Sequence, residues 1–272
     1  MGSIPMIYQE YVGHIMWQPT ANCTMGCKDC YVAKSNSTEV NVQTILDIYF
    51  HQTITCNQFT ISADNLLSFP KALHDALRCV WKLYPDTSLP ELCVTANSWN
   101  TVLCWAREMN MNVDQFLKPI TILSLSNFPP LGKNVGEMIE QCHTNNTKVN
   151  FNYMVKGGEE DSKYFDMGCR YADQVYLVYK KAPLGEEQCA ESFSNWLKAR
   201  KIGKEIAPNK IIEDQCIMDA LHYIHTGHKC GAGKKKAQVW PNGKLTGCPD
   251  DSNQTCGDMG TCKICEVVRG TN

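Results

Sequence analysis

The sequence predicts an α/β protein built as a partial, open (β/α)6 barrel. Between residues 12 and 226, a short extended segment is followed by a segment of helical pattern six times over. This alternation indicates parallel strands joined by crossover helices. Six units are fewer than the eight of a closed barrel, so we expect the barrel to be open. An open doubly wound sheet is the alternative that the pattern also permits.

The expected strands are short runs rich in β-branched and aromatic residues, with helices between and after them. The strands span residues 12–20, 57–62, 91–97, 120–126, 148–155 and 174–180. The helices span residues 40–51, 70–83, 99–109, 135–143, 161–171, 190–200 and 211–225. Pro70 fits the first turn of its helix, and Pro85 follows the end of the same helix.

One side of several expected strands carries small polar residues, because alternate residues of a strand face the same way. These residues are Gln58, Thr60, Ser62, Cys93, Thr95, Asn97, Ser124, Ser126, Asn150 and Asn152. A closed barrel fills its interior with bulky branched side chains. The polar side therefore predicts a lumen that holds a polar ligand. A solvated sheet face is the alternative, although parallel strands usually have both faces covered.

Composition and charge exclude several classes of protein. With 272 residues, of which 43% are hydrophobic and 20% charged, the chain can bury a normal core. A net charge of −2 gives no global sign of a nucleic-acid or membrane partner. No apolar run reaches the roughly 18 residues of a membrane span, and no secretory leader opens the chain. We expect a cytoplasmic protein without a membrane partner, and regard nucleic acid as a weakly supported partner of the basic residues 198–204 and 234–236.

Sixteen cysteines are the unusual feature of the composition. In a reducing compartment, clustered thiols indicate metal or iron–sulfur binding rather than disulfides. One cluster lies within residues 23–30 and another within residues 230–265. The remaining cysteines are scattered singly and are interpreted as small buried hydrophobic residues. They are Cys56, Cys79, Cys93, Cys104, Cys142, Cys169, Cys189 and Cys216.

Cys23, Cys27 and Cys30 form a CxxxCxxC run just after the first expected strand. Loops at this position carry the active site in parallel α/β enzymes. Three thiolates can hold three corners of a cubane cluster and leave one iron open, whereas most electron-transfer clusters have four cysteines. An open iron implies that a small molecule binds there. A structural zinc site, the alternative, needs a fourth ligand, and no cysteine or histidine follows before His51.

These features resemble the radical S-adenosylmethionine (radical SAM) superfamily over most of the chain. The resemblance implies a [4Fe–4S] cluster on Cys23, Cys27 and Cys30, whose open iron binds the amino and carboxylate groups of S-adenosylmethionine. One-electron reduction, by a partner such as flavodoxin or ferredoxin, would cleave this cofactor to a 5′-deoxyadenosyl radical. That radical would abstract hydrogen from the substrate, while the barrel orients the cofactor and excludes water.

The resemblance also assigns residues to S-adenosylmethionine. Residues 62–65 stand where the family has GGEP after strand 2, and they differ from it at every letter; the family's contacts there come largely from the backbone. The family's aromatic residue before the third cysteine is Asp29 here, with Tyr31 one step beyond. Gly157-Gly158-Glu159 looks like the GGE signature but follows strand 5, and is interpreted as an acidic loop before a helix. The implied cofactor-binding residues are Tyr31, Ser62, Ala63, Asp64, Asn97, Ser124, Ser126 and Asn152.

The second cysteine cluster opens with the pattern C-x12-G-x4-C, from Cys230 through Gly243 to Cys248. It is similar to the twitch and SPASM modules of many radical SAM enzymes. The chain would then divide into a barrel over residues 1–228 and a small module over residues 229–272, with a hairpin that turns at residues 241–243. The implied ligands of an auxiliary [4Fe–4S] cluster are Cys230, Cys248, Cys262 and Cys265, with Cys256 as an alternative ligand. A zinc ribbon on the same cysteines is the alternative.

The expected function is oxidation or rearrangement of a small-molecule or nucleotide substrate through hydrogen abstraction. Because only about eleven residues precede the first strand, nothing resembles a separate peptide-recognition domain. Modification of a peptide or protein is the alternative. A non-catalytic iron–sulfur or zinc protein is the remote one, since residues 62–65 depart from the family's motif.

Overall fold

The computed structural model describes residues 12–19, 42–51, 55–62, 71–84, 86, 88–126, 135–155, 159–179, 190–214, 216–218, 221, 236–240 and 245–246. These residues contain a nine-stranded sheet with the order β7-β6-β5-β4-β3-β2-β1-β8-β9. Every neighbouring pair is parallel except β8 and β9. The strands are β1 (Val12–Trp17), β2 (Cys56–Ser62), β3 (Glu91–Ala96), β4 (Ile120–Leu125), β5 (Lys148–Met154), β6 (Gln174–Val178), β7 (Ile211–Glu213), β8 (Lys236–Val239) and β9 (Leu245–Thr246).

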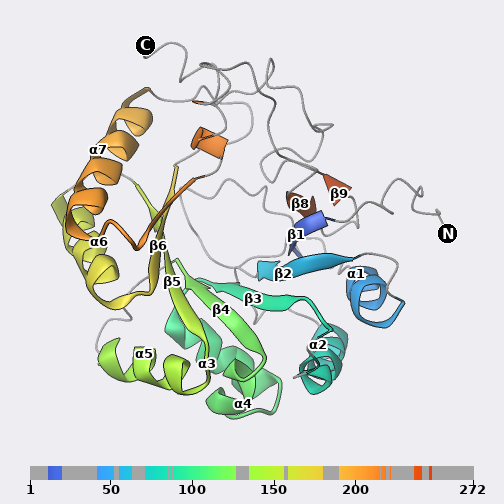
Figure 1. The fold of residues 1–272 in the computed structure, drawn as a ribbon. Coiled ribbons are helices and arrows are strands. Elements are labelled where there is room, and N and C mark those ends of the chain that lie inside the picture. Colours follow the sequence, from blue (N-terminus) through green and yellow to red (C-terminus); the bar gives the residue numbers. More distant parts are fainter. Residues whose placement is uncertain are drawn as a thin grey trace.

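The sheet curls into an open barrel, and the helices lie along its outer side (Figure 1). They are α1 (Gln43–Ile45), the π-helical turn η2 (Leu46–Phe50), α2 (Lys71–Leu83), α3 (Trp99–Glu108), α4 (Val113–Leu117), α5 (Val135–Thr144), α6 (Glu159–Tyr171) and α7 (Ala190–Ile206). None of these helices is long and apolar enough to cross a membrane. A doubly wound sheet would reverse its strand order partway and carry helices on both faces. The consecutive order of β1 to β7 and the single helical layer confirm the predicted partial barrel.

The core lies between the outer face of the sheet and the helices. Alternate strand residues such as Phe59, Val94 and Leu123 are fully buried there. Two tryptophans of the helical layer also donate hydrogen bonds to backbone carbonyls. Trp81 Nε1 of α2 donates to Phe116 O of α4 at 2.8 Å, and Trp196 Nε1 of α7 donates to Leu177 O of β6 at 3.0 Å. Burial of large side chains of this kind contributes about 1.5–3 kcal/mol each. The apolar outer face therefore fixes which side of each strand faces inward.

Two helices end on an asparagine in the left-handed conformation. Asn110 has φ 52° and Asn146 has φ 59°. The next residue in each case bonds back five positions, from Met111 N to Ala106 O and from Thr147 N to Cys142 O, both at 2.9 Å. Asparagine tolerates this conformation better than most residues, and the pattern is that of a Schellman helix end. Each turn directs the chain into the next element close to the edge of the sheet where the strands begin.

The structure corrects the expected helix at residues 211–225. Ile211–Glu213 form strand β7, which pairs with β6 from Val175 to Leu177. Two adjacent β-branched residues suit an edge strand, and Ile211 is 5% exposed within the core. Residues 216–218 are helical, and the backbone N–H of Cys216 donates to Asp214 Oδ1 at 2.9 Å. The short helix α4 was also not expected, although Asn112 and Gln115 form a capping box at its start.

Strand β8 extends the barrel sheet into the segment interpreted as a separate module. It runs parallel to β1, and Gln18 N donates to Val239 O at 2.9 Å beyond the end of β1. Strand β9 pairs with β8 in the antiparallel direction, as expected for the hairpin. Strand β1 therefore lies between β2 and β8 within the sheet.

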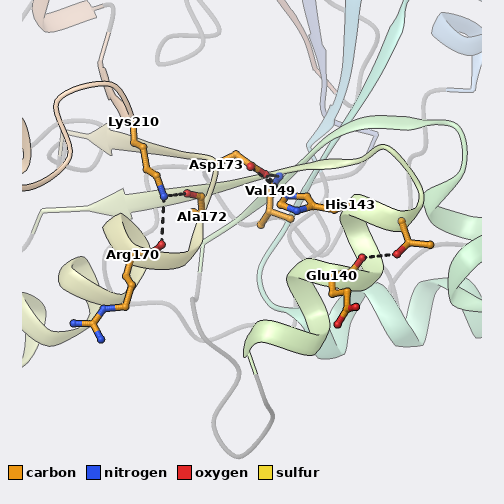
Figure 2. A network of polar contacts seen from close by, with 8 residues as sticks. Glu140, His143, Val149, Arg170, Ala172, Asp173 and Lys210 are labelled. Carbon is orange, nitrogen blue, oxygen red and sulfur yellow. Dashed lines mark hydrogen bonds and ion pairs between the residues drawn. The ribbon is translucent and has the colours of Figure 1, made fainter.

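A polar network holds the N-terminal ends of β5 and β6 together (Figure 2). The carboxylate of Asp173 accepts hydrogen bonds from Val149 N at 2.7 Å and from His143 Nε2 at 2.9 Å. Lys210 Nζ donates to Ala172 O at 2.9 Å and to Arg170 O at 3.3 Å, at the end of α6. A cation there stabilises the exposed carbonyls of a helix C-terminus. This end of the barrel serves stability, which leaves the opposite edge for chemistry.

Three of the seven described scattered cysteines have the buried role that the sequence predicts: Cys93, Cys142 and Cys169. Three others are half-buried, whereas Cys79 is exposed and departs from the prediction; the described cysteines form no disulfide. Burial raises the pKa of Cys56, Cys93 and Cys142 to about 12 and that of Cys169 to about 11. Because only the thiolate attacks electrophiles or binds metals, these thiols are inert at neutral pH.

Gly168 tests the packing of α6 on the sheet. A Cβ at this position would overlap the Cδ1 atom of Phe151, which is a buried residue of β5. Alanine favours a helix more than glycine does, but the overlap with Phe151 should destabilise the fold by more than this gain. We therefore expect Gly168→Ala to lower the free energy of unfolding by about 1–2 kcal/mol. Urea denaturation followed by circular dichroism measures it. Gly203→Ala is the comparison, because its Cβ would meet the ends of the Ile211 and Phe165 side chains at 2.8 and 2.9 Å, a milder overlap than the one with Phe151 at Gly168. A Gly168→Ala protein that is more stable than wild type would contradict the packing.

Alkylation tests the burial of the thiols. Cys79 is exposed, whereas Cys142 is fully buried. We expect iodoacetamide at pH 7.5 to modify Cys79 in the folded protein at least about tenfold faster than Cys142. Mass spectrometry of tryptic peptides measures the two rates, and unfolding in urea should remove the difference. Equal rates in the folded protein would show that Cys142 of α5 does not face the buried core.

Candidate functional site

The structure gathers the predicted cofactor residues that it describes along one edge of the sheet. Ser62 ends β2, Ser124 lies near the end of β4, and Asn152 lies in β5. Asn97 and Ser126 directly follow β3 and β4. In a parallel sheet these positions share the C-terminal edge, where α/β proteins bind their ligands. The five residues come from four consecutive strands.

Strand register shows that these residues face inward together. Ser62 pairs with Thr95, Thr95 with Ser124, Ser124 with Asn150, and Asn150 with Gln174. Directly paired residues of parallel strands point to the same side of the sheet. Their neighbours along each strand, such as Ile61 and Leu125, are buried in the outer core. The predicted polar lumen is therefore present from β2 to β6.

Among the described residues of β1 to β6, the inward-facing side is uncharged from the row of Ser62 upward. These residues are Gln18, Ser62, Thr95, Asn97, Ser124, Ser126, Asn150, Asn152, Met154, Gln174, Tyr176 and Val178. Charged inward-facing residues lie at the opposite edge: Glu91 and Lys148 begin β3 and β5. Hydroxyl and amide groups hydrogen-bond neutral ligand groups without a large desolvation cost. The C-terminal half of the lumen therefore suits sugar hydroxyls and base edges.

Side chains in the lower half of the lumen hydrogen-bond to one another. His14 Nε2 and Thr60 Oγ1 are 2.7 Å apart, and Gln58 Nε2 donates to Glu91 Oε2 at 3.4 Å. Cys93 lies beside Thr60 on the next strand, and burial keeps its pKa high despite the hydrogen bond from that hydroxyl. These groups satisfy one another at the floor of the site. A ligand would reach the lumen from the C-terminal edge.

One buried polar atom at this site lacks a partner. Asn150 Oδ1 is inaccessible to solvent and accepts no hydrogen bond from any described residue. A buried acceptor left unsatisfied costs about 1–3 kcal/mol. A bound molecule that donated a hydrogen bond to Asn150 Oδ1 would remove this cost. The sequence had placed Asn150 on the polar side of its strand without assigning it a ligand.

Tyr176 is an inward-facing residue that the sequence did not assign to the polar side of its strand. It is half-buried on β6, opposite Asn152, while its neighbours Val175 and Leu177 are fully buried on the outer face. The sequence of residues 174–178 is Gln-Val-Tyr-Leu-Val. Alternate residues of a strand share a face, so Tyr176 could have been assigned to the same face as Gln174. Tyr176 is the only aromatic ring facing inward from β2 to β6 among the described strand residues.

The proposed metal ligands lie outside the described residues. This holds for Cys23, Cys27 and Cys30, for Cys230, Cys248, Cys256, Cys262 and Cys265, and for Tyr31, Ala63 and Asp64. Within the described ranges, no group of three or more histidine, cysteine or acidic residues could hold a metal ion. The segment with Cys23–Cys30 follows the C-terminal end of β1, which lies beside the end of β2 at Ser62. The neutral donors and the open acceptor of the lumen fit an adenosyl cofactor that approaches from that side.

Comparison of the fold with solved structures supports the resemblance. Native anSMEcpe with bound AdoMet and Cp18Cys peptide, an anaerobic sulfatase-maturating radical SAM enzyme, superposes with a TM-score of 0.54 at 12% sequence identity. The match covers 93% of this chain and 80% of anSMEcpe. A tryptophan synthase alpha-subunit mutant from Pyrococcus furiosus matches at 14% identity over 74% of this chain and 77% of its own, with a TM-score of 0.41.

No protein-family model and no curated protein sequence matches the chain. The similarity to known proteins therefore lies in the three-dimensional structure. The open sheet of parallel strands, with its helices on the outside, is the architecture that the resemblance predicted. The chain has the partial-barrel fold of radical SAM enzymes.

Proposed function

We propose that this protein is a radical SAM enzyme that reductively cleaves S-adenosylmethionine. The observation that carries the proposal is the neutral polar row from Ser62 to Gln174, at the edge where β1 leads into the CxxxCxxC segment. The fold supports it, because anSMEcpe has the same architecture and was solved with bound AdoMet. Cys23, Cys27 and Cys30 would hold the [4Fe–4S] cluster, and a one-electron donor such as flavodoxin or ferredoxin would reduce it.

When bound, the cluster and S-adenosylmethionine supply an electron and a carbon radical for hydrogen abstraction. The chain's own residues bind and orient the cofactor. Ser124 and Asn152 offer hydroxyl and amide groups to its polar atoms, and Ser62 lies where its amino group would be held. The described inward-facing residues around them on β2 to β6 carry no charge, which limits competing ion pairs. Below them, the side chains of His14 and Thr60 hydrogen-bond to each other.

A peptide or protein is the substrate class that the comparison favours. The superposition with anSMEcpe covers 93% of this chain, and that enzyme was solved with a bound peptide. The sequence had favoured a small molecule or nucleotide, and the neutral lumen is compatible with such a substrate as the second candidate. Either substrate would lose a hydrogen atom to the radical.

A second cluster on the C-terminal cysteines is part of the proposal. Cys230 lies six residues before β8, and Cys248 lies two residues after β9. Because β8 and β9 pair in the antiparallel direction, the hairpin brings its two flanks to one end. Cys262 and Cys265, or Cys256 in place of one of them, would complete four ligands.

Anaerobic reconstitution with iron and sulfide tests the enzyme. With dithionite and S-adenosylmethionine, we expect the wild-type protein to form 5′-deoxyadenosine, and Cys27→Ala to lower its rate at least about a hundredfold. Chromatography of the quenched reaction measures the product. Cys79→Ala is the matched control, because Cys79 is an exposed thiol on α2 and should change nothing. A wild-type protein that binds iron but forms no 5′-deoxyadenosine would exclude the proposal.

Iron analysis of the same samples tests the second cluster. Two clusters predict about eight iron atoms per chain, and Cys248→Ala with Cys262→Ala should remove about four of them. The Cys27→Ala protein should keep the C-terminal four. Unchanged iron in the double variant would refute the auxiliary cluster, and zinc in place of iron would indicate a zinc ribbon.

Treatment of a natural substrate pool tests the substrate class. We expect a cell extract of small proteins and peptides to stimulate 5′-deoxyadenosine formation, since substrate commits the radical to turnover. Digestion of the extract with proteinase K should abolish the stimulation, whereas ribonuclease should leave it unchanged. Stimulation by a protease-treated, ultrafiltered extract would instead support the small-molecule or nucleotide substrate.

A further inference from the structure

We propose that the inner face of β5 to β7 binds a large apolar side chain of a peptide substrate. The inference rests on the proposed function and names the chemistry that its substrate must carry. The face, called here the apolar wall, consists of Met154, Tyr176, Val178 and Ile212. Met154 pairs with Val178, and Tyr176 pairs with Ile212. Neighbouring strands lie about 4.8 Å apart, so these side chains form one continuous surface.

Ile212 faces the lumen because the residues on either side of it face the helical layer. Ile211 is 5% exposed and packs under α7. Glu213 Oε1 accepts a hydrogen bond from Arg200 Nε of the same helix. Since alternate residues of a strand point to opposite sides, Ile212 points inward.

Ile212 is exposed, although the strand residues of the core are buried. Its exposed fraction is 37%, and the other exposed large hydrophobic residues that the structure describes all lie on helices, on the outer side of the barrel (Figure 1). Ile212 is therefore the only strand residue of this kind within the described ranges, and it faces the concave side of the sheet. Ligand sites are concave and mostly apolar. Its exposure indicates a surface that a bound molecule covers.

The polarity of the inner face changes across the sheet at Asn152. On one side, Asn97 and Ser126 follow β3 and β4 and offer polar groups. On the other side, the described residues at this level and above are those of the apolar wall on β6 and β7. The polar side is where the proposed function places the cofactor. Ile212 lies two strands beyond Asn152, about 10 Å away, which leaves the apolar wall to the substrate.

The apolar wall selects against charge. No described residue of the wall is charged, so a carboxylate or ammonium group placed there would lose its hydration without gaining a partner. An aliphatic or aromatic side chain would instead cover the exposed surface of Ile212 and leave water. The wall therefore predicts a peptide with leucine, phenylalanine or a similar residue near the position that reacts.

Pools of short synthetic peptides test the inference. In each pool one position is fixed as Leu, Phe, Ser, Asp or Lys, and the other positions vary. The readout is the initial rate at which the reconstituted enzyme forms 5′-deoxyadenosine with dithionite and S-adenosylmethionine. At one or more positions, we expect pools with Leu or Phe to stimulate this rate about tenfold more than pools with Ser or Asp.

Variants of Ile212 assign that preference to the wall. We expect Ile212→Ser to lower the preference for Leu over Ser at least about threefold, and Ile212→Val to keep it within about twofold of wild type. Ile212→Lys should make the Asp pool better than the Leu pool, because the new ammonium group pairs with a carboxylate. Ile206→Ser is the matched control: Ile206 is 53% exposed on α7, in the outer layer, and its loss should change nothing.

Binding of S-adenosylhomocysteine separates the wall from the cofactor site. Isothermal titration calorimetry should give wild type and Ile212→Lys the same dissociation constant within about twofold. Loss of binding in a variant with normal thermal melting would assign the wall to the cofactor and overturn the inference. Pools that stimulate equally or not at all, or a Leu preference that survives Ile212→Lys, would also overturn it. In these cases, wild-type formation of 5′-deoxyadenosine would leave the proposed function standing, and its absence would refute both.

Discussion

The in-register pairing of parallel strands β2 to β6 is the constraint on which the site depends. Because paired residues share a face, one polar residue per strand becomes a continuous row across the sheet. The same rule sends Ile61, Leu123 and Leu177 to the opposite face, where they are fully buried. A slip of one residue in any strand would exchange the two faces. The helical layer, packed on the apolar side, prevents that exchange.

Stabilising contacts and the polar lumen occupy different faces of the sheet. Asp173, His143 and Lys210 hold the beginnings of β5 and β6. The unsatisfied acceptor of Asn150 lies directly after Val149 on β5, in the row of residues that faces inward. An unpaired buried polar atom is tolerated there because the surrounding core and the Asp173 network fix the strand that carries it.

Much of the fold could be predicted because strand and helix periods are local properties of the chain. Strands β1 to β6 lie where the alternation of residues such as Phe59 and Val94 placed them. Strand β7 was missed because three residues, Ile211 to Glu213, are too few to show a period, and their pairing with β6 is a tertiary contact. The Ser62 to Asn152 row followed from alternation, but the open acceptor of Asn150 depends on its three-dimensional surroundings. The cluster ligands rest on cysteine spacing, and they remain a prediction because they lie outside the described residues.

The position of β8 beside β1 has a consequence for the order of assembly. His14 pairs with Lys236, so one edge of β1 stays open until a segment far along the chain has been translated. An unpaired edge is a template for association with other chains. During synthesis, the strand that leads into the CxxxCxxC segment therefore lacks its second neighbour while β2 to β6 are already available. Completion of the sheet around β1 is therefore a late event in the folding of the nascent protein.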